Sequence, residues 1–438
     1  MFKIGKTKIP HRKHTASLTA VRIDTPELVS IPMVHHIGAP AVPCVKVGDK
    51  LCVGTKIAEA GGYVSAAIHS SVSGTVKKIE PYLAGNGSSC PKVVIESDGE
   101  MTPDPAICPP TVTNLDELCD AVRASGLVGL GGAGFPTAVK LDGAKKGNIK
   151  YLIVNAAECE PYITVDNRTM LDDAEYVKKG IDLLEKYIPG TEVIIGIEKN
   201  KPLAIAKMKE TFADDSRVSV SVLPSTYPQG SEKVLVYNTT GRAIPEGGLP
   251  SDVDCIVINV TTVAFIAHYV ETGMPLVEKA ITVDGSAVKE PKNLIVPVGT
   301  PIKDVLNAAS VGEDVGKVMY GGPMMGMAVY SLDDPILKNT NAITAFTLRD
   351  AKSPEQYPCI HCGKCVSACP VGLNPTAFVK AMQVEDRNDR AARLEAAKLN
   401  LCMECGSCSF VCPSHRPLVE NHRLAKSDLK NFKSANKN

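Results

Sequence analysis

The stretch from Cys359 to Pro413 organises this chain, because it contains one cysteine pattern written twice. The first copy reads Cys359-Ile-His-Cys362-Gly-Lys-Cys365-Val-Ser-Ala-Cys369-Pro370, and the second reads Cys402-Met-Glu-Cys405-Gly-Ser-Cys408-Ser-Phe-Val-Cys412-Pro413. Both copies follow C-x2-C-x2-C-x3-C-P, the spacing with which proteins hold a pair of [4Fe-4S] clusters. The first three cysteines of each copy ligate one cluster, and the fourth cysteine of that copy ligates the other cluster.

The duplicated pattern predicts crossed ligation within a two-cluster ferredoxin-type helical domain over residues 350–422. Four cysteines should hold the first cluster: Cys359, Cys362, Cys365 and Cys412. Four others should hold the second: Cys402, Cys405, Cys408 and Cys369. A single C-x2-C pair also suits zinc, so structural zinc is the alternative, but two full copies favour iron–sulfur.

The residues around these cysteines have helical composition. Between the two copies, residues 376–399 predict two helices that are broken near residues 386–389. Residues 423–438 form a basic tail, which we expect to be solvated and disordered. Its cations are Arg423, Lys426, Lys430, Lys433 and Lys437.

Composition excludes some classes of function. The 438 residues carry zero formal net charge, so no global field recruits nucleic acid. No stretch approaches the roughly 18 uninterrupted apolar residues of a membrane span. The most apolar stretch, residues 255–270, contains Asn259 and His268 and predicts a buried strand followed by a helix. The start at Met1 lacks the apolar region of a signal peptide, so we expect any membrane association to be peripheral and made through partners.

Fifteen cysteines do not indicate disulfides here, because eight belong to the duplicated pattern. The others show no pairing spacing, and we interpret nearly all of them as small buried apolar residues. They are Cys44, Cys52, Cys90, Cys108, Cys119, Cys159 and Cys255. Cys159 is the exception, because it lies within a group of polar residues described below.

Residues 1–105 are rich in short strands and glycine turns, as in Val47–Leu51 and Ser70–Ile79. This region resembles the barrel-sandwich domains of biotinyl and lipoyl carriers, which attach their cofactor to a lysine at a hairpin tip. The corresponding turn, Glu59–Tyr63, contains no lysine. We therefore interpret the region as a scaffold, and the prolines of residues 103–110 as a linker.

Residues 113–272 alternate helices and strands, which predicts a Rossmann-like α/β layer with a mainly parallel sheet. Asn114 is the expected N-cap of the first helix. The predicted strands are Tyr151–Val154, Glu192–Ile197, Val218–Leu223 and Val253–Ile258, and helices between them include Asp172–Tyr187 and Lys201–Phe212.

A glycine-rich loop lies near the start of this region. It reads Gly129-Leu-Gly131-Gly132-Ala-Gly134-Phe135-Pro136-Thr137-Ala-Val-Lys140. Its G-x-G-x-x-G match is weak alone, because a helix and not a strand precedes it. Glycines expose backbone N–H groups that suit phosphate, and Lys140 adds a positive charge. A glycine loop used only for packing is the alternative.

Polar residues follow several of the predicted strands. The first group reads Asn155-Ala-Ala-Glu158-Cys159-Glu160-Pro161, and further groups are Tyr227–Glu232 and Asn259–Thr262. Ligands of open α/β sheets bind outside the carboxyl ends of the strands. A solvated turn is the alternative for each group, but two acids and an amide beside a glycine loop favour a binding site.

These motifs together resemble the NADH-binding flavoprotein subunit of respiratory complex I. The resemblance implies noncovalent FMN, with its phosphate held by Gly129, Gly131, Gly132 and Lys140 and its ring lined by Asn155 and Glu158. It implies that Phe135 stacks on NADH and that Glu160 contacts the nucleotide. Tyr227, Gly230 and Asn259 would complete the flavin wall. The chain departs from that family at Ala157, where Asp is usual, and at Cys159, where Ser is usual.

The order of the parts resembles a second family more closely. Residues 273–345 resemble a β-grasp (SLBB-like) domain, closed by Tyr320–Gly326. For its methionines we expect core packing, with the lining of a cofactor as the alternative. Barrel sandwich, FMN/NADH domain, β-grasp and two-cluster domain together resemble the RnfC subunits of the ion-translocating ferredoxin:NAD+ oxidoreductases.

The resemblance implies a function in membrane-bound electron transport. NAD accepts a hydride, iron–sulfur clusters pass single electrons, and a flavin exchanges both, so FMN belongs between them. The implied partners are NAD(H), the integral membrane and ferredoxin-like subunits of the same complex, and, indirectly, ferredoxin. The implied location is the cytoplasmic face of a membrane, and other subunits of the complex would translocate Na+ or H+. Two alternatives stay open: a soluble reductase resembling cobalamin reductase, and an electron-wiring scaffold with an inactive nucleotide site, for which Ala157 is the one hint.

Overall fold

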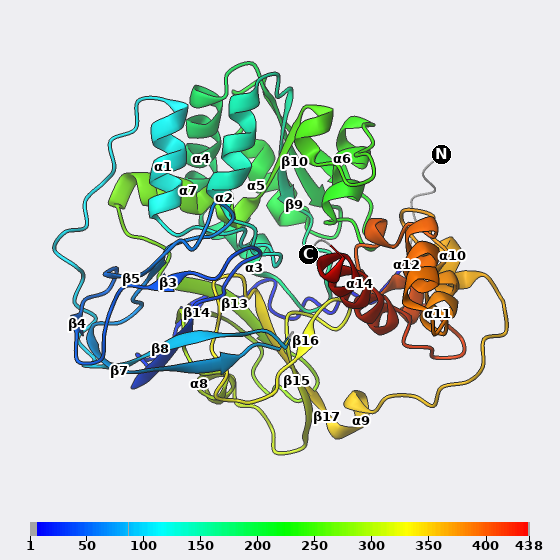
Figure 1. Cartoon of the computed structure of the whole chain (residues 1–438). Coiled ribbons are helices and arrows are strands. Elements are labelled where there is room, and N and C mark those ends of the chain that lie inside the picture. The colour runs from blue at the N-terminus through cyan, green and yellow to red at the C-terminus, as the bar shows by residue number, and fades with distance from the viewer. Residues whose placement is uncertain (1–6, 86, 437–438) are drawn as a thin grey trace.

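A computed structural model describes residues 7–85 and 87–436 of the chain, in four parts (Figure 1). An α/β layer lies at the top of that view, two β-rich parts lie below it, and the cysteine-bearing helices lie at the right. The start at Met1 and the tail cation Lys437 lie outside the described residues. The sequence predicts a multidomain chain of α/β and α+β parts, and the multidomain α/β architecture is confirmed.

The first β-rich part consists of two packed antiparallel sheets. One has the order β2 (Leu28–Pro32), β8 (Ser89–Ser97), β7 (Gly74–Leu83), β4 (Lys50–Leu51), and the other has β3 (Val42–Pro43), β5 (Lys56–Glu59), β6 (Ile68–His69). Alternate residues such as Val29, Ile31 and Ile95 point into a shared core and are fully buried. The region is thus a two-sheet β structure, as its turn-rich sequence predicts.

The N-terminal segment, residues 7–23, lies outside these two sheets. Thr7 pairs with Tyr227 of the α/β layer, and β1 (Val21–Arg22) pairs in parallel with β14 (Lys292–Pro297) of the other β-rich part. The segment therefore contacts two parts of the molecule before the chain enters the first sheet at Leu28.

The α/β layer is built on a parallel sheet of order β11-β10-β9-β12. Its strands are β9 (Tyr151–Ala156), β10 (Glu192–Glu198), β11 (Val218–Leu223) and β12 (Cys255–Asn259). Its helices are α1 (Leu115–Ala124), α2 (Thr137–Asp142), α3 (Val165–Asp172), α4 (Ala174–Tyr187), α5 (Pro202–Thr211), α6 (Glu232–Thr240) and α7 (Val260–Thr272), with 3-10 turns at Gly143–Lys146 and Pro250–Val253. The predicted parallel sheet is confirmed, and so is the N-cap at Asn114, whose side chain accepts from the N–H of Glu117.

The order of the strands fixes where a ligand crevice lies. The chain runs from β9 outward through β10 to β11, and then returns to place β12 on the other side of β9. The strand order therefore reverses beside β9, which is the position where open α/β sheets bind ligands at their carboxyl ends. Asn155 of β9 and Asn259 of β12 are register neighbours at this edge.

The second β-rich part is a mixed sheet of order β1-β14-β13-β17-β15-β16. Its other strands are β13 (Glu278–Asp284), β14 (Lys292–Pro297), β15 (Val315–Tyr320), β16 (Met327–Ala328) and β17 (Ala342–Thr347). Helix α8 (Ile302–Ala308) packs on this sheet through Ile302, Val305 and Leu306. Strand β13 ends just before Gly285, and α8 begins three residues after Gly299.

The cysteine-bearing part is helical and follows the short helix α9 (Leu348–Ala351) and an exposed linker. It contains α10 (Lys364–Ala368), α11 (Pro375–Met382), α12 (Arg387–Ala396), α13 (Ser407–Phe410), α14 (Leu418–Ala435) and a 3-10 turn at Leu399–Leu401. The predicted break between two helices falls between α11 and α12, where Asp386 caps α12 by accepting from the N–H of Asp389.

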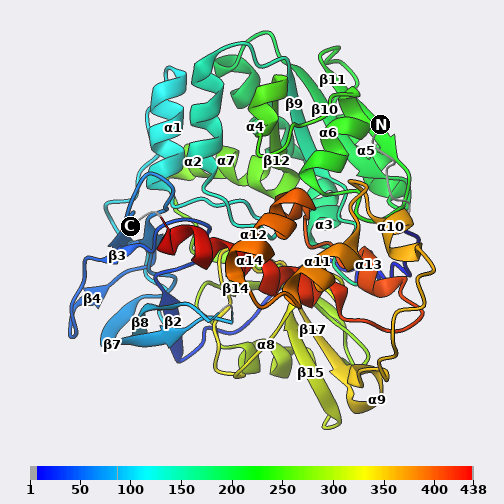
Figure 2. The same ribbon diagram turned by 45° about the vertical axis from the view of Figure 1, so that its right-hand side comes forward.

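The prediction that the basic tail is disordered is wrong. Helix α14 continues to Ala435 and lies across the front of the molecule in Figure 2. Ala425, Leu429 and Phe432 recur at helical spacing and pack against Phe378 in the core of this part. The cations alternate with this apolar stripe, so a count of charge alone misses the amphipathic helix.

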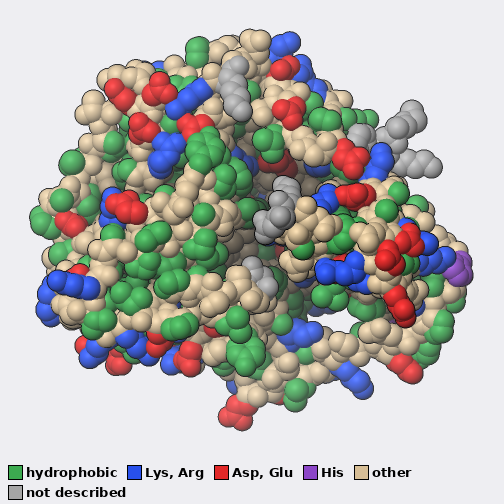
Figure 3. Space-filling model, in the orientation of Figure 1, with side chains coloured by type: hydrophobic (Ala, Val, Ile, Leu, Met, Phe, Trp, Pro, Cys, Tyr) green, Lys and Arg blue, Asp and Glu red, His purple; other side chains and the backbone are tan. Residues whose placement is uncertain are grey.

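No helix in residues 7–85 and 87–436 is long and apolar enough to cross a membrane. Positively and negatively charged side chains are interspersed on the face shown in Figure 3, in keeping with a net charge of zero.

Lys338 is buried where three parts of the molecule meet. Its side chain is fully buried, and its Nζ donates to the carbonyl of Ala67 in the first β-rich part and of Gly126 in the α/β layer, each at 2.7 Å. Its own N–H donates to Nδ1 of His35 at 3.1 Å. Burial lowers the pKa of Lys338 to about 7, because an ammonium group loses its hydration there.

Leu429→Ala should lower the free energy of unfolding of the cysteine-bearing part by about 2–5 kcal/mol, since it opens a cavity beneath α14. Leu429 is 3% exposed, whereas Leu424 on the same helix is 64% exposed and serves as the control. Denaturant titration of both variants checks this. Equal stability of Leu429→Ala and Leu424→Ala would contradict the packing of α14.

Lys338→Met should remove a pH dependence of stability. In the folded chain the pKa of Lys338 is about 7 and its ordinary value is 10.5, so between these values the unfolded chain binds more protons. The free energy of unfolding of the wild type should therefore rise with pH through this window. Lys338→Met should lack that rise and be less stable throughout, because two buried carbonyls lose their donor. Denaturant titrations from pH 6 to pH 10 measure this, with the partly exposed Lys207 of α5, changed to Met, as control.

Candidate functional site

The predicted polar groups meet at the carboxyl edge of the parallel sheet. Asn155 and Asn259 lie side by side there, and the glycine loop packs against them. A Cβ on Gly131 would lie 3.0 Å from Nδ2 of Asn259, so a side chain at that position would crowd the strand end. Three segments that are far apart in the sequence thus form one site.

The glycine loop offers backbone donors. The N–H of Gly129 donates to the carbonyl of Phe135 at 2.8 Å, and the N–H of Leu130 donates to Oγ1 of Thr262 at 3.0 Å, which fixes the loop's ends. In the described part of the chain, no acceptor takes the N–H groups of residues 131–133. Successive free N–H groups of this kind suit an anion such as a phosphate.

Phe135 and Lys140 follow the loop on either side of the start of α2. Phe135 is half-buried and is not one of the fully buried core residues. Lys140 has partners that the sequence does not reveal: its Nζ lies 3.0 Å from Oε2 of Glu232 and 3.1 Å from the carbonyl of Val257. Its charge is therefore already paired, although its side chain keeps 29% of its exposure.

Asn155 connects the end of β9 to Gly230 by a hydrogen bond. Its Nδ2 donates to the carbonyl of Gly230 at 2.9 Å, and its Oδ1 accepts from the N–H of Ala157. The N–H of Gly230 points at Sγ of Cys159 at 3.4 Å. Burial raises the pKa of the Cys159 thiol to about 12, so this thiol stays protonated at neutral pH.

Glu158 connects the strand end to α3. Its carboxylate accepts from the N–H of Asp166 at 2.7 Å and of Asn167 at 3.3 Å, at the positive end of that helix. Asp166 in turn accepts from Nδ2 of Asn259 at 2.8 Å and from Oγ1 of Thr261 at 2.7 Å. Burial raises the pKa of Glu158 to about 7, although nearby ammonium groups oppose the rise.

Glu160 reaches the other side of the site, where it contacts the loop after β15. Its Oε1 accepts from the N–H of Met324 at 2.6 Å and of Met325 at 3.1 Å, and its Oε2 accepts from the hydroxyl of Tyr227 at 3.2 Å. A Cβ on Gly322 would lie 2.3 Å from Cγ of Glu160, so only glycine fits there. Burial raises the pKa of Glu160, and these hydrogen bonds oppose the rise.

Tyr227 lies between the strand ends and the second cysteine motif. It is 1% exposed and packs in one apolar cluster with Ile9 and Cys405. Ser231 donates to Sδ of Met403 at 2.9 Å, and Gly406 lies so close to the carbonyl of Met324 that a Cβ would be 2.5 Å from it. The second motif is therefore docked directly against the strand-end site.

The eight cysteines form two groups of four. One cavity is lined by Cys369, Cys402, Cys405 and Cys408, and another is lined by Cys359, Cys362, Cys365 and Cys412. Four thiol groups around each cavity make a donor set that suits an iron–sulfur cluster. The two groups differ in exposure, because Cys405 and Cys408 are buried whereas Cys362 is exposed.

Two lysines that the sequence did not indicate donate hydrogen bonds to the backbone of this site. Lys13 donates to the carbonyls of Glu158, Glu160 and Ile163, and Lys201 donates to the carbonyl of Ala157 at 2.6 Å. Lys13 lies 145 residues before Glu158, and no local pattern connects the two. Lys201 precedes α5 and has no signal beyond its position after a strand.

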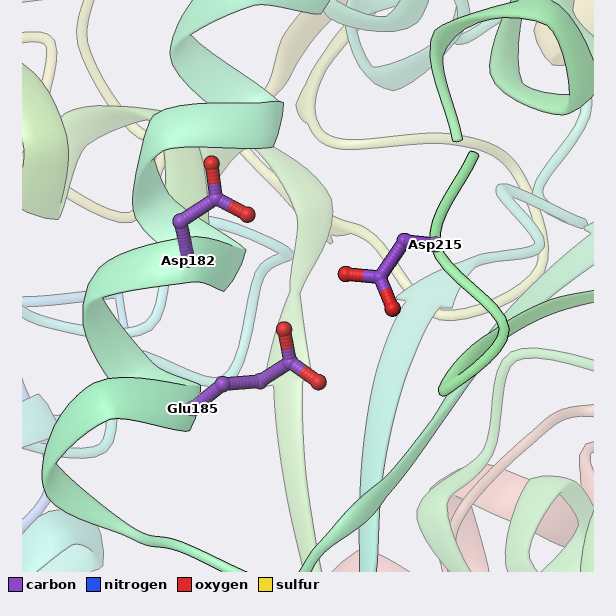
Figure 4. A group of neighbouring side chains, drawn as sticks. All are labelled: Asp182, Glu185 and Asp215. Atoms are coloured by element: carbon purple, nitrogen blue, oxygen red, sulfur yellow. The ribbon is translucent and has the colours of Figure 1, made fainter. Parts of the chain in front are cut away.

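A separate group of acids lies away from this site. Asp182 and Glu185 of α4 and Asp215 lie close together in Figure 4. An Nη of Arg217 lies 3.0 Å from both Glu185 and Asp215, so this group already has a counter-charge. We assign it no ligand.

Three family profiles match separate stretches of the chain. The RnfC barrel sandwich hybrid domain matches residues 2–100, the Nuo51 FMN-binding domain matches residues 122–268, and the 4Fe-4S dicluster domain matches residues 355–416.

Curated proteins match across most of the chain. The C subunit of the proton-translocating ferredoxin:NAD(+) oxidoreductase complex of Clostridium ljungdahlii is 40% identical over 381 residues, covering 86% of this chain and 83% of that protein. The C subunit of the Na(+)-translocating ferredoxin:NAD(+) oxidoreductase complex of Acetobacterium woodii is 41% identical over 381 residues, covering 85% and 86%. Among solved structures, the air-oxidized NAD+-reducing [NiFe]-hydrogenase aligns with a TM-score of 0.49 at 21% identity, covering 74% of this chain and 63% of that chain.

Proposed function

The chain belongs to the RnfC family, the C subunits of ion-translocating ferredoxin:NAD+ oxidoreductase complexes, and from this premise we propose that it is the NAD(H)-binding, FMN- and iron–sulfur-containing subunit of such a complex. The observation that carries the proposal is the direct contact between the strand-end site and the second cysteine motif, made by Tyr227 and Cys405. A nucleotide site and a cluster site in contact are what electron transfer between ferredoxin and NAD+ requires.

The proposed FMN site uses the glycine loop and the strand ends. Gly129, Gly131 and Gly132 would hold the phosphate through the loop, with Lys140 adding charge nearby. The ring would lie among residues gathered at the carboxyl edge of the sheet: Asn155, Glu158, Tyr227, Gly230 and Asn259. FMN bound there would supply the exchange between hydride and single electrons. The free N–H groups of the loop support this site and argue against a pure scaffold role.

The proposed NAD(H) contacts are Phe135 and Glu160. Phe135 directly follows the glycine loop and is half-buried, so its ring is available to stack on a planar ligand above the loop. Glu160 is held in place by Met324, Met325 and Tyr227, which gives its carboxylate a fixed position beside the site. Both residues would orient the nucleotide and exclude water.

The proposed cluster order follows from exposure. The cluster held by Cys402, Cys405, Cys408 and Cys369 would be the inner one, since Cys405 packs against Tyr227. The cluster held by Cys359, Cys362, Cys365 and Cys412 would be the outer one, since Cys362 and the neighbouring Ile360 are exposed. The outer cluster would exchange electrons with partner subunits.

We assign the parts of the chain accordingly. The proposed domains are a barrel-sandwich scaffold (1–105), a Rossmann-like FMN/NADH domain (113–272), a β-grasp domain (273–345), a two-cluster domain (350–422) and a basic C-terminal segment (423–438). Residues 7–23 lie outside the two sheets of the first domain, and α14 joins the C-terminal segment to the core of the two-cluster domain. The partners would be integral membrane and ferredoxin-like subunits at the cytoplasmic face of the membrane. The relatives' names include both proton and Na+ translocation, so we assign no coupling ion.

One experiment tests the proposed function. The protein purified with its partner subunits is denatured, the released flavin is identified, and the untreated sample is titrated with NADH while optical and EPR spectra are recorded. We expect FMN in the supernatant and NADH-dependent reduction of iron–sulfur signals. Absence of flavin, or zinc in place of iron, would refute the proposal.

Cys369→Ala should damage the inner cluster, although Cys369 belongs to the first motif in sequence. The reason is the crossed grouping of Cys369 with Cys402, Cys405 and Cys408 around one cavity. We expect iron content to fall and the EPR signal of one cluster to be lost, while the other persists. Cys108→Ala is the control, because Cys108 lies outside both motifs and is exposed, like Cys44 and contrary to the burial that the sequence predicts for most of these cysteines. An unchanged iron content in Cys369→Ala would rule out crossed ligation.

Phe135→Ala should raise the KM for NADH by several-fold to about tenfold, since an aromatic stacking contact contributes about 0.5–1.5 kcal/mol beyond area burial. FMN should remain bound, because the loop N–H groups are unchanged. Steady-state kinetics with an artificial acceptor, flavin content and melting temperature are measured on one preparation. A core role for Phe135 would instead lower stability and flavin content together, with the KM of the folded fraction unchanged.

A further inference from the structure

The N-terminal segment from Thr7 to Ala16 runs along the proposed nucleotide site without belonging to a sheet. The N–H of Tyr227 donates to the carbonyl of Thr7 at 2.9 Å, and the N–H of Tyr162 donates to the carbonyl of His11 at 3.0 Å. Ile9 packs against Tyr227 and Cys405. The segment therefore contacts the turn that follows β9 through His11 and the turn at Tyr227 through Thr7 and Ile9.

Lys13 is the centre of these contacts. Its Nζ donates to the carbonyls of Glu158 at 2.8 Å, Glu160 at 2.8 Å and Ile163 at 2.5 Å, which uses all three of its protons. The carbonyls belong to one turn, residues 157–163. Lys201, in the loop after β10, binds the same turn through the carbonyl of Ala157.

The turn needs such support because its backbone is strained. Glu158 has φ of 47° and Tyr162 has φ of 72°, and both values lie in the left-handed region that costs a non-glycine residue free energy. Several carbonyls converge on one point in this conformation, and their dipoles repel one another unless a cation lies between them. The Lys13 ammonium occupies that point.

The side chains on this turn are the ones that face the site. When the carbonyls of Glu158 and Glu160 are held by Lys13, the Glu158 carboxylate reaches the N–H of Asp166 and the Glu160 carboxylate reaches the N–H of Met324. The backbone orientation that Lys13 fixes therefore determines the position of both acids.

We propose that Lys13 is a positioning residue of the nucleotide site, which acts from outside the α/β layer by fixing the turn that carries Glu158 and Glu160. The proposal rests on the proposed function for the identity of the ligands, FMN and NAD(H). It makes the N-terminal segment an integral part of that site. Lys13 touches only backbone carbonyls in this role, so its effect on ligands passes through the turn.

The test compares Lys13→Met with Lys8→Met in the full complex. Met keeps the length of the side chain and removes the ammonium, and Lys8 is an exposed lysine of the same segment. The dissociation constant of FMN, the KM for NADH, the melting temperature and the iron content are measured for each. Hydrogen exchange of the amides in residues 157–163 is measured with and without added FMN.

We expect Lys13→Met to weaken FMN binding and raise the KM for NADH by about tenfold or more, since three charge-assisted hydrogen bonds are lost. Turnover per bound FMN should change less, and iron content should be unchanged. Amide exchange over residues 157–163 should increase even in samples without FMN. Lys8→Met should match the wild type in every measurement.

A rescue experiment separates positioning from general stability. Lys13→Ala removes the atoms beyond Cβ, which propylammonium matches in size and charge. Added propylammonium should restore FMN binding to Lys13→Ala and slow the amide exchange of the turn, whereas tetramethylammonium at the same ionic strength should not.

The inference is overturned if Lys13→Met exchanges its turn amides and binds FMN as the wild type does. It is also overturned if flavin is lost only together with iron and melting temperature, and propylammonium restores nothing. A wild type that holds no FMN refutes the proposed function instead. The exchange of the turn amides then still decides whether Lys13 fixes the turn.

Discussion

The carboxylate of Glu160 is the contact on which the arrangement of this molecule depends. It accepts from Met324 and Met325 of the mixed-sheet part and from Tyr227 of the α/β layer, so one side chain joins two parts. The same loop lies against Gly406 of the second cysteine motif, which adds the third part. A buried carboxylate is costly unless hydrogen bonds satisfy it, and here three donors converge on it. The position of the proposed nucleotide site relative to the proposed inner cluster site is thereby fixed by directional hydrogen bonds and not by apolar packing alone.

Buried lysines satisfy carbonyl oxygens, just as the three donors satisfy the carboxylate of Glu160. Lys338 serves two carbonyls where three parts of the chain meet, and Lys13 serves three carbonyls in the turn after β9. An ammonium group has three donors and no acceptor, so it can satisfy carbonyl groups that converge from segments not paired with each other in a sheet. The cost is desolvation of the charge, which lowers the pKa of both lysines. Junctions between parts of a chain lack regular secondary structure, and these lysines supply the hydrogen bonds that a sheet or helix supplies elsewhere.

The parallel sheet explains why the site lies beside β9. The strand order reverses there, and open α/β sheets bind their ligands at the carboxyl ends of the strands beside such a reversal. The glycine loop closes that edge from one side and the Tyr227 turn closes it from the other. The second cysteine motif packs against this edge through Cys405, which lies in one apolar cluster with Tyr227 and Cys159, so the proposed cluster site adjoins the proposed nucleotide site.

The sequence alone determined the local chemistry of this protein. The spacing of the eight cysteines indicated two clusters, and the alternation of helices and strands over residues 113–272 predicted the parallel sheet, because both depend on neighbours along the chain. The tertiary structure alone decided what surrounds those groups. It paired Lys140 with Glu232, bound Glu160 to Met324 and brought Lys13 to a turn 145 residues away. It also folded the basic tail into α14, whose apolar stripe has a partner only once α11 and α12 have formed. Such contacts join segments that no pattern of spacing connects, so only the folded chain reveals them.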